Sequence, residues 1–333
     1  MEKRNSTIDL AKYVASVMIV AIHTGLFSDV NENLSFAVVH IVCRLAVPFF
    51  AVCSGYFLGG RLEFDETMLC SSHNKAVFIK QWKKLILLYG VWSVIYLFHS
   101  IPMWIKIGWF SPFAFVDYAI GAVTNGSHYH FWYLWGMIYT LPVFYGLLRI
   151  CKRKFWIPVV TILWLFKVLG YSYTMLVPEQ VAGMLGRMGT LVCLLPLLLV
   201  GVVLRVQQEK PLRFYLTGFL LSAAGLTAEA LMLREIGQDA VSYIVFTIPA
   251  AYFLFGTILK IKMCGNSKQI GQLGAVSMFI YCVHPILVEL TENTFKNSLI
   301  HFVFAAAGST VLGLVYIYVR KKMNRKKVML CST

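Results

Sequence analysis

The chain has 333 residues, of which 59% are hydrophobic and 14% are charged, and its mean hydropathy is +0.71. Soluble domains have about 45–50% apolar and about 25% charged residues, so this composition excludes a soluble globular protein and indicates several membrane spans. The formal net charge of +15 would suit a nucleic-acid-binding protein, but the distribution of the basic residues excludes that class.

Apolar runs of about 20 residues between polar breaks predict ten transmembrane helices. These runs cover residues 8–28, 36–58, 78–100, 130–150, 155–173, 182–204, 211–232, 241–262, 273–291 and 299–319. The connection 101–128 mixes aromatic and polar residues, which favours a short interfacial helix over another span. We therefore predict an all-α, polytopic protein in which residues 1–333 form a single membrane domain, with no soluble domain.

Basic residues in the short connections predict the orientation of these helices. With the N-terminus in the cytoplasm, they gather in cytoplasmic segments such as 61–84, 149–154 and 320–327, and acidic residues lie mostly on the other side. Both termini are therefore expected in the cytoplasm, and topology accounts for the net charge.

The eight cysteines form neither a C-x-x-C pair nor a Cys/His cluster, so no disulfide framework or metal site is predicted.

Ionisable residues inside these apolar runs are costly, by about 3 kcal/mol or more for a charge at mid-membrane. Counting about 1.5 Å per residue puts most of them in the outer half of the membrane. These are His23, Arg44, His128, His130, Arg187, Glu229 and His284. Lys12 lies in the inner half, about three helical turns and about 16 Å from His23 on the same helix face. The pattern predicts a path with a cation at its inner mouth and an imidazole at its outer reach.

Most of these residues also have a structural interpretation. Lys12 and Lys167 could snorkel to the lipid headgroups, and His128 could be an interfacial residue. Arg187 and Glu229 could be interface charges, or could pair with each other. His23 and Arg44 are harder to explain in this way, because arginine keeps its charge when buried and needs a partner or water.

Four segments, taken in order, resemble motifs of the acyltransferase type 3 family of bacterial membrane proteins. Lys12 and His23 are similar to its first-helix pattern of a basic residue, ten residues and a histidine. The segments "RLAVPFFAVCSGYF" from Arg44, "HFWYLW" from His130 and "YCVHP" around His284 resemble its later motifs. The chain is most similar in character to the membrane half of vancomycin-resistance serine racemases. It has no soluble racemase domain and no esterase-like domain, so no racemase activity is expected.

The resemblance implies a multi-pass protein of the bacterial cytoplasmic (inner) membrane. Its implied activity is transfer of an acyl group, usually acetyl, from cytoplasmic acyl-CoA to a hydroxyl or amine, such as O-acetylation of a cell-envelope or small-molecule acceptor. We expect His23 to act as the base or transient acyl carrier, Arg44 to stabilise the oxyanion, and Lys12 to bind the donor's phosphates. The remaining candidates are expected near the acceptor or behind His23: His130, His284, Arg187 and Glu229.

The implied partners are acyl-CoA as donor substrate, an unidentified acceptor and membrane lipids, with no permanently bound cofactor, no metal ion and no nucleic acid. The main alternative is a transporter of a small amino acid such as serine, because prolines interrupt several of the predicted helices. These prolines are Pro48, Pro142, Pro196 and Pro285. A purely structural or partner-binding subunit would leave His23, Arg44 and Lys12 unexplained. Dependence on acyl-CoA separates the first two functions.

Overall fold

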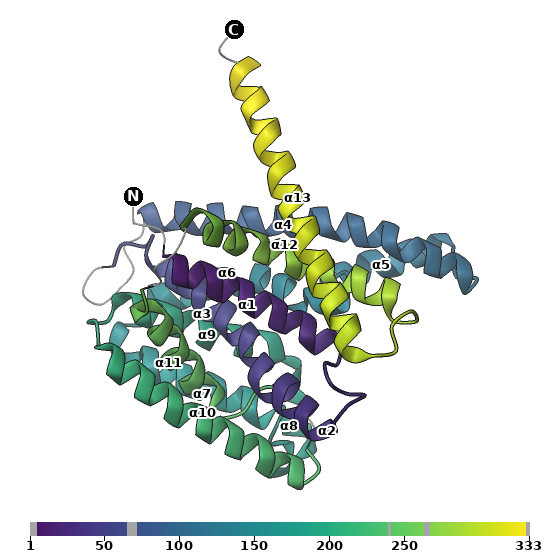
Figure 1. The fold of residues 1–333 in the computed structure, drawn as a ribbon. Coiled ribbons are helices and arrows are strands. Elements are labelled where there is room, and N and C mark those ends of the chain that lie inside the picture. Colours follow the sequence, from purple (N-terminus) through teal and green to yellow (C-terminus); the bar gives the residue numbers. More distant parts are fainter. Residues whose placement is uncertain (1–4, 65–71, 239–240, 263–266, 331–333) are drawn as a thin grey trace. The chain divides into compact units, whose positions relative to one another are not determined.

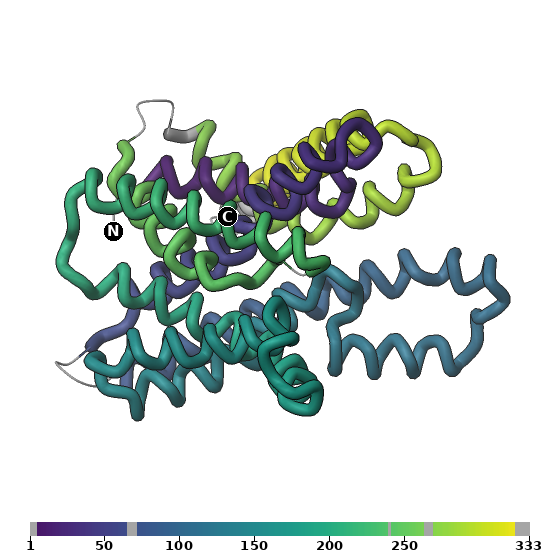
Figure 2. Tube along the Cα trace, turned by 90° about the horizontal axis from the view of Figure 1, so that it is seen from below, coloured from purple at the N-terminus to yellow at the C-terminus, as the bar shows by residue number. Residues whose placement is uncertain are grey.

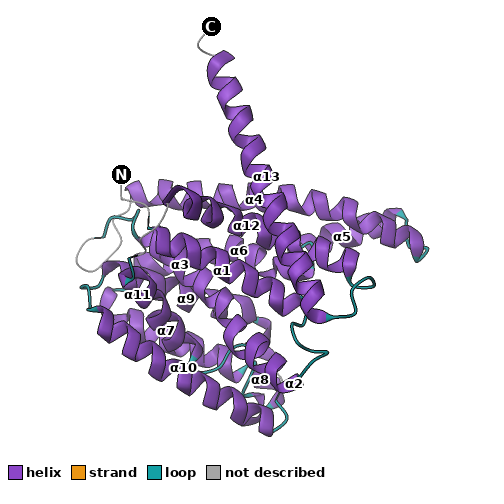
Figure 3. Ribbon diagram, in the orientation of Figure 1, coloured by secondary structure: helices purple, strands orange, loops and turns teal. Residues whose placement is uncertain are grey.

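The computed structural model describes residues 5–64, 72–238, 241–262 and 267–330. These residues form helices joined by turns and loops, with no strand among them (Figure 3). The chain divides into two compact units. The first contains Met1–Phe50, Glu209–Ser242 and Pro249–Thr333, and the second contains Ala51–Gln208 and Tyr243–Ile248.

The first unit is assembled from helices that are distant in the sequence (Figure 1). Its elements are α1 (Ser6–His23), α2 (Glu32–Ser35), the π-helix η1 (Phe36–Val42), the 3₁₀ turn η2 (Cys43–Leu45), the start of α3 (Ala46–Gly59), α10 (Leu212–Glu235), most of α11 (Thr247–Lys260), α12 (Ser267–Thr291) and α13 (Ser298–Leu330).

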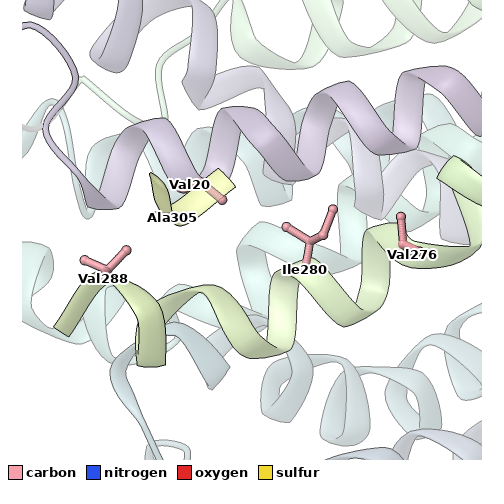
Figure 4. Packing of buried hydrophobic residues seen from close by; sticks show 5 residues of the cluster. All are labelled: Val20, Val276, Ile280, Val288 and Ala305. Atoms are coloured by element: carbon pink, nitrogen blue, oxygen red, sulfur yellow. The ribbon is translucent and has the colours of Figure 1, made fainter. Parts of the chain in front are cut away.

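The core of this unit lies where α1 and α13 pack against α12. Val276, Ile280 and Val288 on α12 form an apolar cluster with Val20 of α1 and Ala305 of α13 (Figure 4). The α12 residues recur at multiples of four, so they lie along one face of the helix. That face of α12 is buried against α1 and α13.

The second unit is built around α9, most of whose residues are buried. Its elements are the rest of α3, α4 (Ser72–Lys106), α5 (Pro112–Thr124), η3 (Tyr129–Phe131), α6 (Trp132–Ile150), η4 (Arg153–Phe155), α7 (Trp156–Leu169), η5 (Thr174–Leu176), α8 (Glu179–Arg187) and α9 (Gly189–Val206). Glycines let α3 and α9 approach closely, since a Cβ atom at Gly55 would lie 2.0 Å from the Leu198 carbonyl oxygen. Small residues at such crossings are typical of membrane helices.

Helix α4 differs from the predicted span 78–100, because it has 35 residues and a length of about 52 Å. It continues through Pro102, which removes only one backbone hydrogen bond, a loss that membrane helices tolerate. The end of α4 and α5 form a hairpin that extends beyond the other helices of this unit (blue in Figure 2).

The structure confirms an all-helical chain with multiple apolar helices, but not the count of ten. Eight helices within the described residues are long and apolar enough to cross a membrane. The predicted helix 182–204 is interrupted at Met188, because the mostly exposed α8 is more polar than α9 and contains two glycines. The predicted helix 155–173 is reduced to the 14 residues of α7, and the helix predicted from residue 241 begins only at Thr247.

Candidate functional site

Helix α1 carries two of the predicted site residues, Lys12 and His23. It begins after Asn5, whose side chain accepts hydrogen bonds from two N–H groups of the first turn, at 3.0 and 3.3 Å. It ends at His23, and Gly25 then adopts a left-handed conformation with φ of +58°. His23 is therefore the last helical residue, and its side chain is half-buried.

His23 lies against His284 of α12. The centroids of the two rings are 5.2 Å apart and the ring planes are tilted by 34°. His284 is completely buried, and its Nδ1 lies 3.0 Å from the Ile280 carbonyl oxygen. Because a carbonyl oxygen only accepts hydrogen bonds, Nδ1 carries the proton of this contact and donates it.

The position of His284 on α12 explains why it is buried. It is four residues from both Ile280 and Val288, so it belongs to the same row that supplies the apolar cluster against α1 and α13. An imidazole at an otherwise apolar core position costs free energy unless its polar atoms are satisfied. This placement favours a functional role for the histidine over simple packing.

Arg44 lies in the 3₁₀ turn η2, directly after the seven-residue π-helix η1. The sequence predicted a regular helix over 36–58 and gave no sign of this irregularity. Segments of π-helix are rare and are frequent at functional sites. Arg44 is half-buried, and its Nε is buried with no hydrogen-bond partner among the residues that the structure describes. A guanidinium in this setting favours an anionic or strongly polar ligand.

The segments that carry His23 and Arg44 are packed together. Helix α1 lies against η2. Ala21 of α1 and Cys43 of η2 belong to one buried apolar cluster with Leu26 and Val39. Since Ala21 precedes His23 by two residues and Cys43 directly precedes Arg44, one unit brings the two main predicted catalytic residues into the same region.

Lys12 has a counter-ion, Asp9, which was not among the residues predicted from the sequence. The Lys12 Nζ lies 3.8 Å from Oδ1 of Asp9, which is buried at 6% exposure. The spacing of three residues along α1 is the signal that could have revealed the pair. Gly274 of α12 leaves room for Asp9, because a Cβ atom there would lie 2.5 Å from the Asp9 side chain.

The other predicted site residues are distributed between the two units. Glu229 is buried on α10 in the first unit. His130 belongs to the second unit, where it is 2% exposed and its Nδ1 lies 3.0 Å from Nδ1 of His128. Both histidine rings lie near the ring of Tyr96, at 5.1 and 4.5 Å between centroids. Arg187, also in the second unit, is exposed at the end of α8.

Lys167, for which the sequence allowed snorkelling to the lipid headgroups, is instead buried among aromatic rings. Its side chain is buried at 8% exposure, and Nζ lies 4.5 Å from the ring centroid of Tyr171 and 4.2 Å from that of Tyr243. Two aromatic faces thus stabilise the ammonium group inside the second unit.

The described residues contain no group of three His, Cys, Asp or Glu side chains that could hold a metal ion.

A sequence model of the acyltransferase-domain family matches residues 5–319, which is nearly the whole chain. The chain belongs to the type 3 acyltransferase family. This match confirms the resemblance indicated by the segments around His23, Arg44, His130 and His284.

Known relatives of the chain include two amino-acid racemases of Enterococcus faecalis. They are 26% and 24% identical to it over 97% and 98% of this chain, and over 46% and 48% of their own lengths. A serine/alanine racemase of Enterococcus gallinarum is 25% identical over 96% of this chain and 46% of the relative. The chain thus spans about half the length of these curated relatives. No solved structure matches it.

Proposed function

We propose that this acyltransferase moves an acyl group, acetyl in the simplest case, from acyl-CoA on the cytoplasmic side to a hydroxyl or amine of a cell-envelope or small-molecule acceptor. The observation that supports this most strongly is the contact between the rings of His23 and His284 inside the first unit. It supplies an imidazole for proton transfer and a second ring, fixed by its own helix, to hold that imidazole.

In the proposed reaction His23 takes the proton from the acceptor hydroxyl or amine. The acceptor atom attacks the thioester carbonyl carbon, the carbon–sulfur bond then breaks, and the His23 imidazolium returns its proton to the leaving CoA thiolate. The product is the acylated acceptor with free CoA. His284 keeps the His23 ring in place and acts as a positioning residue.

Arg44 supplies the positive charge for the oxyanion of the tetrahedral intermediate. Its buried Nε supports this role. Lys12 binds the phosphates of the donor at the inner end of α1, in competition with Asp9, its partner in the ion pair. An incoming phosphate group would therefore displace or share a carboxylate.

The test is release of free CoA from acetyl-CoA by the full chain in lipid, with a cell-envelope and metabolite extract as the acceptor source. His23→Ala is expected to lower extract-dependent release by about 10²–10⁴-fold, the usual contribution of a general base. His73→Ala, which changes an exposed histidine in the other unit, is the matched control and should retain activity. If the wild type neither turns over nor binds acetyl-CoA, the proposal that acyl-CoA is the donor is wrong.

Transport of a small amino acid such as serine is the second candidate. It is favoured by the names of the relatives, which are racemases of amino acids including serine and alanine. Uptake of labelled serine into vesicles containing the chain, with no need for acyl-CoA and no modified product, would support it. Loss of activity in His23→Ala fits both candidates, so acyl-CoA dependence is the measurement that separates them.

A further inference from the structure

A groove of about 290 Å³ lies between α4 and α6 in the second unit. Its floor is formed by buried residues, including Phe78 and Leu141, and its walls by the exposed side chains of Ile79, Trp82 and Pro142. This volume is close to the lower limit of about 300 Å³ for small-molecule sites. The groove is therefore large enough to enclose part of a ligand and is open along one side.

A proline fixes the shape of this groove. Pro142 has no N–H, so the carbonyl of Ile138, four residues earlier, loses its helical partner. The Trp82 indole Nε1 donates to that carbonyl at 2.7 Å. The bond locks the Trp82 ring in place as a wall and also satisfies its only polar atom. Trp82 therefore offers a ligand only an apolar surface.

The remaining polar groups of the groove gather at one end. Lys75 lines it together with Tyr145, whose hydroxyl is buried with no hydrogen-bond partner among the described residues. Arg149 is close by, with Cζ 5.8 Å from the centroid of the Tyr145 ring. The surface of the groove itself is almost entirely apolar, and Trp82 is seven residues along α4 from Lys75, so the charged groups lie at its edge about 10 Å from Trp82.

The two helices that line the groove carry charge of one sign, although Glu63, whose backbone pairs with the Asn74 side chain, lies near its Lys75 end. Neither α4 nor α6 contains an aspartate or a glutamate, whereas α4 also carries the exposed Lys80, Lys83 and Lys84. Lys75 and Arg149 both fall in segments that the distribution of basic residues predicts to be cytoplasmic. Clusters of basic residues at the inner membrane surface attract anionic lipids.

We propose that this groove binds one anionic glycerophospholipid of the cytoplasmic leaflet. The phosphate lies between Lys75 and Arg149, the Tyr145 hydroxyl donates to a phosphate or ester oxygen, and one acyl chain lies along Ile79 and Pro142 toward Trp82. A lipid explains together the apolar walls, the two cations at one end and the buried hydroxyl. This site is additional to the proposed acyl transfer and does not depend on it.

The proposal is tested with the full chain purified in detergent, by thermal unfolding and by native mass spectrometry. Phosphatidylglycerol is expected to raise the unfolding midpoint more than phosphatidylcholine with the same chains, and one molecule should stay bound in the mass spectrum. Lys75→Gln should weaken phosphatidylglycerol binding about fivefold, the usual effect of one basic residue near the surface. Lys83→Gln, which changes an exposed lysine of α4 that does not line the groove, is the matched control.

Ile79→Trp, which fills the groove, should abolish retention of the lipid, whereas Leu87→Trp, on the exposed surface of the same helix, should not. Tyr145→Phe leaves the packing in place and removes the hydroxyl, so it tests the site even where Ile79→Trp unfolds the protein. Equal stabilisation by the two lipids, or equal retention in the groove and control variants, would overturn the proposal. Retention of palmitoyl-CoA but not of phosphatidylglycerol by the protein would also overturn the proposal, and would assign the groove to an acyl-CoA donor.

Discussion

His284 is an imidazole at a position where the helix pattern calls for an aliphatic side chain. If it only filled space, a ring of similar size without nitrogen would replace it. His284→Phe is therefore expected to keep the thermal unfolding midpoint within a few degrees and to lower kcat for CoA release by about 100-fold, because His23 loses its positioning partner. The KM for acetyl-CoA should change little. Wild-type turnover in this variant would reduce His284 to a packing residue.

Asp29 connects the loop after α1 to the start of α13. The Ser298 hydroxyl donates to its carboxylate, and this bond is the main reason why the pKa of Asp29 is lowered. A lowered pKa means that the carboxylate stabilises the fold above its unfolded-state pKa, and this stabilisation is lost as the pH falls through the folded-state value. Asp29→Asn should therefore lower the unfolding midpoint at neutral pH. Melting curves across a pH series should show the difference shrinking as the pH falls below about 3.9, the ordinary pKa of an aspartate, and a constant difference would contradict this explanation.

At the scale of single helices, α1 and α12 depend on one glycine for their close contact. A Cβ atom at Gly274 would lie 2.5 Å from the Asp9 side chain. We expect Gly274→Ala to destabilise the protein by about 1–3 kcal/mol through overpacking, and to reduce CoA release because the helices that carry His23 and His284 move apart. Thermal unfolding and turnover are measured beside Gly90→Ala, where the new methyl group meets nothing within 4 Å. Equal effects in the two variants would contradict the packing argument.

The hydrophobic pattern predicted where most helices lie, because runs such as 211–232 and 299–319 have clear polar limits. It was less successful where backbone geometry, rather than hydropathy, decides the structure. The π-helix η1 is as apolar as its neighbours, and α4 passes through Pro102 without a change in composition. The break between α8 and α9 at Met188 has a sequence signal in the polar and glycine residues of α8. A 20-residue window hides this signal, because it averages the hydropathy of α8 with that of the apolar α9.

At the scale of the whole molecule, the distribution of basic residues predicts which loops face the cytoplasm. In a variant without native cysteines, a cysteine at Asn293 should react with a membrane-impermeant thiol reagent in intact cells, whereas one at Lys210 should react only after permeabilisation. The reason is that the 205–213 loop is basic and the 292–297 loop lies at the opposite end of α12 from the basic segment 260–268. Labelling of both positions in intact cells would contradict the orientation.

The candidate site could be predicted only in part from the sequence. His23 and Arg44 stood out because their charge or polarity conflicts with an apolar run, and one unit does bring their segments together. Depth also selected Arg187 and, together with a family-like motif, His130, but a count of residues along a helix gives height in the membrane and not the lateral neighbours. Their place in the second unit depends on tertiary packing, which no local pattern contains.

The discontinuous first unit has a consequence for biosynthesis. Its segments come from the beginning, the later middle and the end of the chain, whereas the second unit is almost one continuous stretch. His23 leaves the ribosome 261 residues before His284. The second unit can therefore be completed during translation, while α1 waits in the membrane for α12 until synthesis is nearly finished. During that interval α1 can pack against η1 and η2 but lacks α12 and α13, so a chaperone or insertase that shields the face around Val20 would act at this stage.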